Sequence, residues 1–171
     1  MKLLTVSALL CAVMALTTAA GDINMFAGCT TGWTQFNGKC YIYEPRSMTY
    51  AEAEKNCQNK GANLASVHSD EEYKHLQNVV YQATNANGQA WIGGSDCQQG
   101  VWFWSDGTTF DYAKWCRGQP DNFGGNQGCA YMNYGDYDCL DWDDGICATL
   151  FPSVPTLHFK TRFTPISIRR D

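Results

Sequence analysis

The sequence predicts an α+β fold, in which two helices are followed by a small antiparallel sheet with long loops. Two stretches carry helix-capping signals followed by apolar residues at helical spacing. After residue 89, short aromatic or aliphatic runs alternate with loops rich in glycine and aspartate, a pattern typical of strands. Long loops in a compact domain need support. The chain's nine cysteines and its acidic segments therefore predict loops held by disulfides and a metal ion.

The N-terminus has the layout of a secretory signal peptide. Lys2 precedes an apolar run from Leu3 to Leu16, and small residues end at Ala20. The apolar run is too short for a comfortable membrane span. We expect residues 1–20 to be removed, residues 21–28 to form a short N-terminal segment, and the protein to be secreted, extracellular and not inserted in a membrane. The net charge of −5 disfavours nucleic acid and anionic membranes as partners.

A hairpin is expected first. Residues 29–43 alternate polar and bulky side chains around Asn37-Gly38, a strong turn signal. Residues 48–61 then predict a helix, in which Thr49 and Glu52 form a capping box and Gly61 ends the helix. Its expected inner face consists of Ala51, Ala53 and Cys57.

Residues 69–83 predict the second helix. Ser69 and Glu72 match the capping box, and the residues expected to face inward are Tyr73, Leu76, Val79 and Val80. Strands are expected at residues 90–94, 101–107, 129–134 and 146–151. Trp91 and Ile92, in the first of these strands, are expected to be packing residues.

The cysteines predict a disulfide framework in an exported chain. Cys11 lies in the expected signal peptide, which leaves eight cysteines in the mature chain. Zinc is the competing interpretation. It is disfavoured because the chain has no C-x-x-C pair, and because His68, His75 and His158 show no ligand spacing.

Five motifs occur in a fixed order: "GWTQFNGKCY", "WIGG", "WSDGTTFDYAKW", "QPD" and "WDDGIC". In this order they resemble C-type lectin-like domains, including the small secreted fish lectins and the fish type II antifreeze proteins. The resemblance runs from about Cys29 to Val154 and implies the C-type lectin-like fold. The expected domain spans residues 29–155, and residues 156–171 form an atypical basic C-terminal tail.

The resemblance implies a Ca²⁺ site. In sugar-binding members two triplets face each other across the ion, and here they are Gln119-Pro120-Asp121 and Trp142-Asp143-Asp144. A further ligand stands two residues before the next cysteine. The implied ligands are Gln119, Asp121, Gln127, Asp143 and Asp144. Gln127 replaces the family's usual carboxylate and Asp143 its frequent asparagine, so the count of negative charges is unchanged. Pro120 is expected in the cis form. Ca²⁺ prefers such oxygen ligands; the alternative interpretation is a solvated acidic loop.

The order of the amide and carboxylate residues in the first triplet indicates which sugar is bound. Carboxylates only accept hydrogen bonds, whereas amides donate and accept. In the family the Gln-Pro-Asp order accompanies galactose, so the implied carbohydrate-binding residues are Gln119, Asp121 and Asp143. Phe123 is the candidate for stacking on the sugar's apolar face; the alternative is a loop anchor packed on the domain.

The resemblance also implies the disulfides Cys29–Cys40, Cys129–Cys147 and Cys116–Cys139. Cys57 and Cys97 have no assigned partners, because Pro155 and Gly128 stand where the family has their partner cysteines. They stay free, pair with each other, or link two chains into a homo-oligomer.

The C-terminus departs from the family pattern. Residues 156–171 replace the final core strand that the resemblance implies, and they turn basic through Lys160, Arg162, Arg169 and Arg170. Such a segment is either a genuine tail or an altered end of the reading frame, and the second is narrowly favoured.

The implied function is that of a secreted, calcium-dependent lectin that binds galactose-type glycans on microbial surfaces in innate immunity. The alternative is a type II antifreeze protein on the same fold. An enzyme is not expected: Ser66, His68 and Ser69 are close in sequence, but they lack a defined acid partner and an oxyanion feature.

Overall fold

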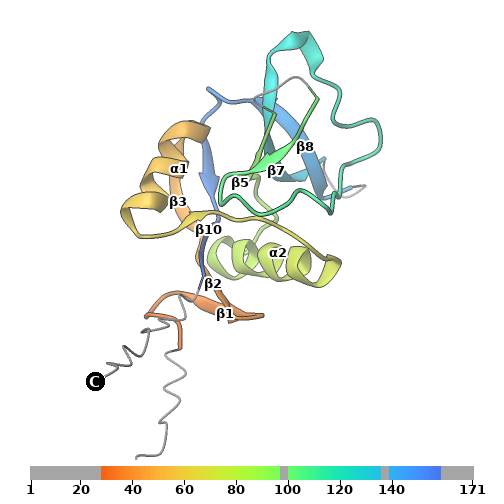
Figure 1. Cartoon of the computed structure of the whole chain (residues 1–171). Coiled ribbons are helices and arrows are strands. Elements are labelled where there is room, and N and C mark those ends of the chain that lie inside the picture. The colour runs from red at the N-terminus through yellow and green to blue at the C-terminus, as the bar shows by residue number, and fades with distance from the viewer. Residues whose placement is uncertain (1–27, 97–99, 136–138, 159–171) are drawn as a thin grey trace, which may run out of the picture.

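The computed structural model describes residues 28–96, 100–135 and 139–158, and it confirms the α+β fold (Figure 1). The helical elements are α1 (Tyr50–Asn59), α2 (Asp70–Thr84) and the short 3-10 helix η1 (Phe123–Gly125). The strands are β1 (Thr34–Phe36), β2 (Lys39–Tyr41), β3 (Glu44–Met48), β4 (Asn63–Leu64), β5 (Ala90–Ser95), β6 (Phe103–Trp104), β7 (Gln127–Tyr134), β8 (Asp141–Ile146), β9 (Phe151–Ser153) and β10 (Pro155–His158). The expected signal peptide, Cys97 and the basic residues of the tail lie outside the described residues.

The strands form two sheets. One has the order β1-β2-β10-β4, and the other has the order β3-β9-β5-β7-β8 with β6 paired to β5. In Figure 1 the long segment between β6 and β7 extends at the upper right, whereas α1 lies to the left and α2 below. No helix in the described part of the chain is long and apolar enough to cross a membrane.

The predicted hairpin is confirmed. β1 and β2 pair in antiparallel register, with Gln35 opposite Cys40. The turn residues Asn37 and Gly38 have φ angles of 44° and 74°. Two successive positive φ values suit an asparagine followed by a glycine, and they match the twist of the flanking strands. A disulfide joins Cys29 to Cys40.

The capping box of α1 is confirmed. The Glu52 amide donates to Thr49 Oγ1, and the Thr49 amide donates to Glu52 Oε2 at 3.0 Å. The chain leaves the helix at Gly61, whose φ is 72°. Ala53 and Cys57 are buried as predicted, but Ala51 is exposed. Ala51 lies in the first turn, away from the sheets that α1 covers, so its assignment to the inner face is wrong.

Only half of the predicted capping box forms at α2. Ser69 Oγ accepts from the Glu72 amide at 3.1 Å. The Glu72 carboxylate instead accepts from Lys39 Nζ at 2.7 Å and Tyr41 OH at 2.5 Å, which ties α2 to β2. The inward residues are buried as predicted, namely Tyr73, Leu76, Val79 and Val80.

The strand predictions hold for β5, β6 and β7 but fail at residues 146–151. That segment contains the last residue of β8, a turn and the first residue of β9. The strand itself is Asp141–Ile146, which includes two buried aspartates, Asp143 and Asp144. Hydrophobic patterning missed this strand because buried carboxylates do not follow the rule that strands bury apolar residues. β3 was also missed.

The final core strand is present. Thr156 of β10 lies opposite Tyr41 of β2 and Asn63 of β4, and its side chain is only 1% exposed. The expectation that the segment from Thr156 onward replaces this strand is therefore wrong for residues 156–158. Pro155 is tolerated at the start of the strand, where its carbonyl still accepts from the Ile42 amide at 3.2 Å.

Disulfides also join Cys116 to Cys139 and Cys129 to Cys147, the pairs that the resemblance implied. Cys57 is buried and unpaired. Trp91 and Ile92 are fully buried, as predicted, and Trp91 Nε1 donates to the Met48 carbonyl at 2.9 Å. This packing makes the sheet around β5 and β7 a rigid support for the loops at its edge.

Candidate functional site

The candidate site forms where the long loop before β7 meets β8. The base of the loop is held against Trp142, whose amide donates to the Lys114 carbonyl at 2.8 Å. The Trp142 carbonyl accepts from the Cys116 amide at 2.9 Å, and Cys116 is also joined by its disulfide to Cys139. Three residues further on, the Gln119–Pro120 peptide bond is cis, as expected. The first triplet therefore starts from a firmly attached segment.

Asp144 holds the first triplet against β8. Its Oδ1 accepts from the Asp121 amide at 3.0 Å, and its Oδ2 accepts from the Asn122 amide at 2.8 Å. The residue is only 1% exposed. A carboxylate that accepts from two consecutive amides fixes the path of the backbone between them. Residues of the two triplets thus meet, although they stand more than twenty positions apart in the sequence.

Asn122 links Gln127 to this loop. It adopts a left-handed conformation with φ of 46°, which asparagine tolerates better than most residues. Its Oδ1 accepts from the Gln127 amide at 3.0 Å. Sequence reasoning missed this role, although an asparagine directly after the triplet was a usable signal for a left-handed turn.

Tyr131 is a second residue that sequence reasoning missed. It lies opposite Asp143 in the β7–β8 register, and its hydroxyl donates to Asp143 Oδ2 at 2.5 Å. Oδ2 of this buried carboxylate therefore accepts a hydrogen bond, whereas Oδ1 has no donor. The pairing depends on strand register, which the sequence does not display.

Three of the five implied ligands carry a buried oxygen without a hydrogen-bond donor. These atoms are Gln119 Oε1, Gln127 Oε1 and Asp143 Oδ1. An unpartnered buried acceptor costs about 1–3 kcal/mol. Oxygens of amides and carboxylates are the ligands that Ca²⁺ takes in proteins. The donor set therefore fits a calcium ion.

Asp121 is exposed, and its Oδ1 accepts from the Phe123 amide at 3.0 Å. Its other oxygen is not used in this turn. No group of three or more His, Cys, Asp or Glu side chains suited to a metal ion occurs in the described residues. A cation at this site would thus depend on the two glutamine amides as well as on the aspartates.

Electrostatics at the site also favour a cation. Burial raises the pKa of Asp143 to about 6, and the negative charges of Asp144 and Asp121 act in the same direction, while the Tyr131 hydrogen bond lowers this pKa. Asp121 lies in the loop before η1, whereas Asp143 and Asp144 lie in β8. A bound positive charge would offset their mutual repulsion.

Phe123 projects into solvent from η1. Its side chain is 79% exposed. A residue that anchored the loop would be packed against the domain, so this alternative for Phe123 is wrong. An exposed ring beside the first triplet is available to a ligand.

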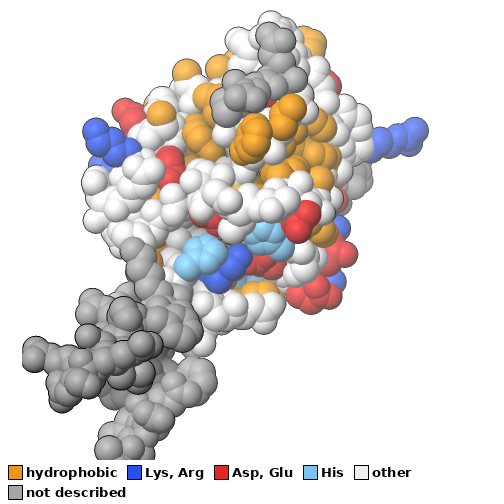
Figure 2. All heavy atoms as spheres, viewed as in Figure 1, with side chains coloured by type: hydrophobic (Ala, Val, Ile, Leu, Met, Phe, Trp, Pro, Cys, Tyr) orange, Lys and Arg blue, Asp and Glu red, His pale blue; other side chains and the backbone are white. Residues whose placement is uncertain are grey.

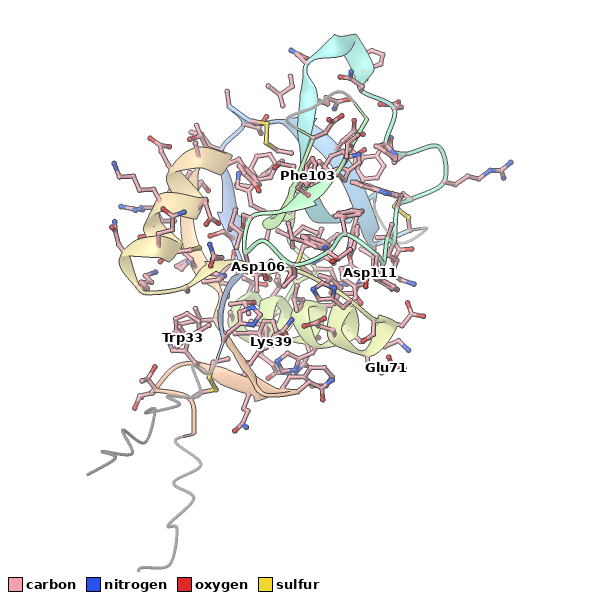
Figure 3. The ribbon with its side chains drawn as sticks, viewed as in Figure 1. Trp33, Lys39, Glu71, Phe103, Asp106 and Asp111 are labelled. Atoms are coloured by element: carbon pink, nitrogen blue, oxygen red, sulfur yellow. A yellow bond between two sulfur atoms is a disulfide. The ribbon has the colours of Figure 1, made fainter. Side chains whose placement is uncertain are left out.

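The face seen in Figure 2 has an apolar upper part and a lower band of histidine and charged side chains. Figure 3 places Phe103 in the upper part and Asp106 and Lys39 in the lower band. Asp106 accepts from Ser66 Oγ at 2.5 Å, whereas His68 lies 3.1 Å from the Thr108 hydroxyl. His68 Nδ1 also lies 3.2 Å from Asp111 Oδ1, so the expectation that these residues lack an acid partner is wrong. The serine and histidine weighed as a hydrolase pair therefore bond to different partners.

The chain is similar in sequence to lectins and to ice-structuring proteins. Residues 46–154 match the Lectin C-type domain family. Ladderlectin of Oncorhynchus mykiss is 39% identical over 177 residues, covering 90% of this chain and 92% of the relative. The galactose-specific lectin nattectin of Thalassophryne nattereri is 37% identical, covering 71% and 75%. A type-2 ice-structuring protein of Osmerus mordax is 40% identical, covering 85% and 87%.

Solved structures of similar proteins differ in their stated relation to calcium. A Ca²⁺-dependent type II antifreeze protein in its Ca²⁺-free form is 39% identical with a TM-score of 0.68, covering 75% of this chain and 99% of the other. A calcium-independent type II antifreeze protein is 37% identical with a TM-score of 0.67, covering 76% and 94%. Calcium dependence must therefore be argued from the residues of each chain.

Proposed function

The chain belongs to the Lectin C-type domain family, and from this premise we propose that it is a secreted, calcium-dependent lectin that binds galactose-type glycans. We further propose that the glycans are microbial and that the protein acts in innate immune recognition. The proposed Ca²⁺ ligands are Gln119, Asp121, Gln127, Asp143 and Asp144. The observation that carries the proposal is the set of buried, unpartnered oxygens on three of these ligands, Gln119, Gln127 and Asp143.

The residues of the site have two different roles in binding, namely positioning the loop and contacting the sugar. Asp144 holds the loop through two backbone amides, and Asn122 attaches Gln127 to it. The calcium ion, when bound, would accept two neighbouring sugar hydroxyls as ligands. The amide nitrogen of Gln119 can donate to a sugar oxygen, and the free carboxylate oxygen of Asp121 can accept from a sugar hydroxyl.

Two observations support galactose. The order of amide and carboxylate in Gln119-Pro120-Asp121 is the order that accompanies galactose in the family that the chain resembles. Nattectin, named as galactose-specific, is a relative at 37% identity. The exposed Phe123 ring would cover the apolar face of the sugar, since aromatic rings pack well on such surfaces.

The test is retention of the secreted protein on galactose resin in millimolar Ca²⁺, followed by elution with EDTA, with mannose resin beside it. We expect retention on galactose alone and release by EDTA. The matched variant is Gln119→Glu with Asp121→Asn, which reverses donor and acceptor and keeps the Oδ1 acceptor for the Phe123 amide. It should move retention to mannose; unchanged galactose binding by this variant would refute the role of the triplet.

Ice binding is the second candidate function. It is favoured by the 40% identity to a type-2 ice-structuring protein, which is as high as the identity to the lectins. A folded protein that shows thermal hysteresis and shapes ice crystals, without retention on either resin, would establish this candidate instead.

A further inference from the structure

A cavity lies at the C-terminal end of α2, far from the candidate calcium site. Its volume is about 610 Å³, within the range of small-molecule binding sites. Its walls come from the last turn of α2, from the segment that leads to β5, and from the end of β7. The residues used below are Tyr81, Asn85, Asn87, Gln89, Asn133 and Tyr134.

The frame of this cavity is held by hydrogen bonds. Asn133 is only 2% exposed, and its Nδ2 donates to the Gly88 carbonyl at 2.9 Å, which joins β7 to the segment before β5. The Leu140 carbonyl accepts from Tyr73 OH at 2.6 Å and from Gln77 Nε2 at 2.9 Å. A cavity with a fixed frame loses little entropy when a ligand binds.

The described lining is polar but uncharged. It contains amides and phenols, and no Asp, Glu, Lys, Arg or His. Among the described residues, the side chains of Asn85, Asn87 and Gln89 make no hydrogen bond within the chain, and the hydroxyls of Tyr81 and Tyr134 make none either. Each amide offers two donors and one acceptor. The cavity thus presents unused donors and acceptors side by side.

Tyr81 adds an aromatic surface, because its side chain is 45% exposed at the edge of the cavity. A saccharide matches this combination, since its hydroxyls both donate and accept and its ring has an apolar face. The described lining offers no opposite charge to a charged ligand.

We propose that this cavity is a second binding site, for a short neutral saccharide, and that it works without a metal ion. The proposal goes beyond the calcium-dependent function and does not rest on it. Gln127 and Tyr134 are the two ends of the eight-residue strand β7, so the two sites are about 24 Å apart. One chain with both sites can bridge two glycan chains, which strengthens binding to a dense surface.

The test uses the secreted protein in EDTA, where the calcium site makes no contribution. Saturation-transfer NMR is recorded with lactose, maltose and N,N′-diacetylchitobiose at millimolar concentration. We expect transfer to at least one sugar, and Tyr81→Ala and Asn87→Ala should each weaken its binding by about fivefold, the effect of one lost contact. Gln82→Ala, an exposed change on the same helix outside the cavity, is the matched control.

The variant Asp144→Ala separates this site from the calcium site. It should lose retention on galactose resin and keep saturation transfer in EDTA. No transfer to any of the three sugars would overturn the second site, as would transfer that Tyr81→Ala and Asn87→Ala leave unchanged. A protein that fails on galactose resin but shows this transfer would refute the calcium-dependent function and leave the second site standing.

Discussion

Replacing Asp144 tests how the first triplet is held. The carboxylate accepts from the amides of Asp121 and Asn122. Hydrogen bonds to charged groups contribute about 1.5–3 kcal/mol each. Water can reach the exposed loop, and repulsion from Asp121 and Asp143 opposes the charge, so we expect Asp144→Ala to cost about 2–4 kcal/mol in metal-free protein. Asp144→Asn keeps one acceptor oxygen and should cost about half as much.

The assay is urea denaturation in EDTA and again in millimolar Ca²⁺. Wild-type protein should gain about 2.7 kcal/mol when calcium reaches a hundred times its dissociation constant, and Asp144→Ala should gain nothing. Asp111→Ala is the control, because this exposed carboxylate pairs with His68 at 3.2 Å on the surface and its removal should leave stability nearly unchanged. An Asp144→Ala variant as stable as this control, or one still stabilised by calcium, would refute the reasoning.

Three further predictions concern other parts of the molecule. Phe123→Ala should weaken galactose binding about threefold to tenfold, as measured by titration calorimetry. Because the ring is 79% exposed, the melting temperature should not change, and a destabilised variant would contradict this. Burial would raise the pKa of Glu72, but hydrogen bonds from Lys39 and Tyr41 lower it below its ordinary value. The stabilisation that the Glu72 carboxylate provides is therefore present above about pH 4.3 and is lost as the pH falls through the lower folded pKa. Glu72→Gln should reduce the loss of unfolding free energy at acid pH, measured by urea denaturation. An unchanged pH dependence would contradict the pairing. Burial raises the pKa of Cys57 to about 12, so its thiol should react with iodoacetamide only in denaturant. Labelling is detected by mass spectrometry, and rapid labelling of the native protein would contradict the burial of this thiol.

Local signals in the sequence predicted the helices and the hairpin well. Thr49 with Glu52, and Asn37 with Gly38, act on residues within a few positions, so their effect can be read along the chain. The prediction for Ser69 was only half correct, since the Glu72 carboxylate bonds to Lys39 and Tyr41 across the fold. A pairing of the Glu72 carboxylate with residues of another strand cannot be read from local spacing.

Strand β8 and strand β10 show a different limit. β8 buries Asp143 and Asp144, and β10 begins at a proline and runs into a basic segment. Patterns of hydrophobic alternation do not recognise either of them. Both strands form because neighbouring strands supply partners for their backbones, which is a property of the assembled sheet.

The sequence by itself determined the fold class, the pairing of six cysteines through the family resemblance, and the set of residues proposed as Ca²⁺ ligands. Only the tertiary structure decided how those residues are held. It brings the amides of Asp121 and Asn122 onto Asp144, places Tyr131 against Asp143, and leaves three buried oxygens without donors. The physical reason is that residue type sets what a side chain can bind, whereas strand register and loop path set which partners remain available to it.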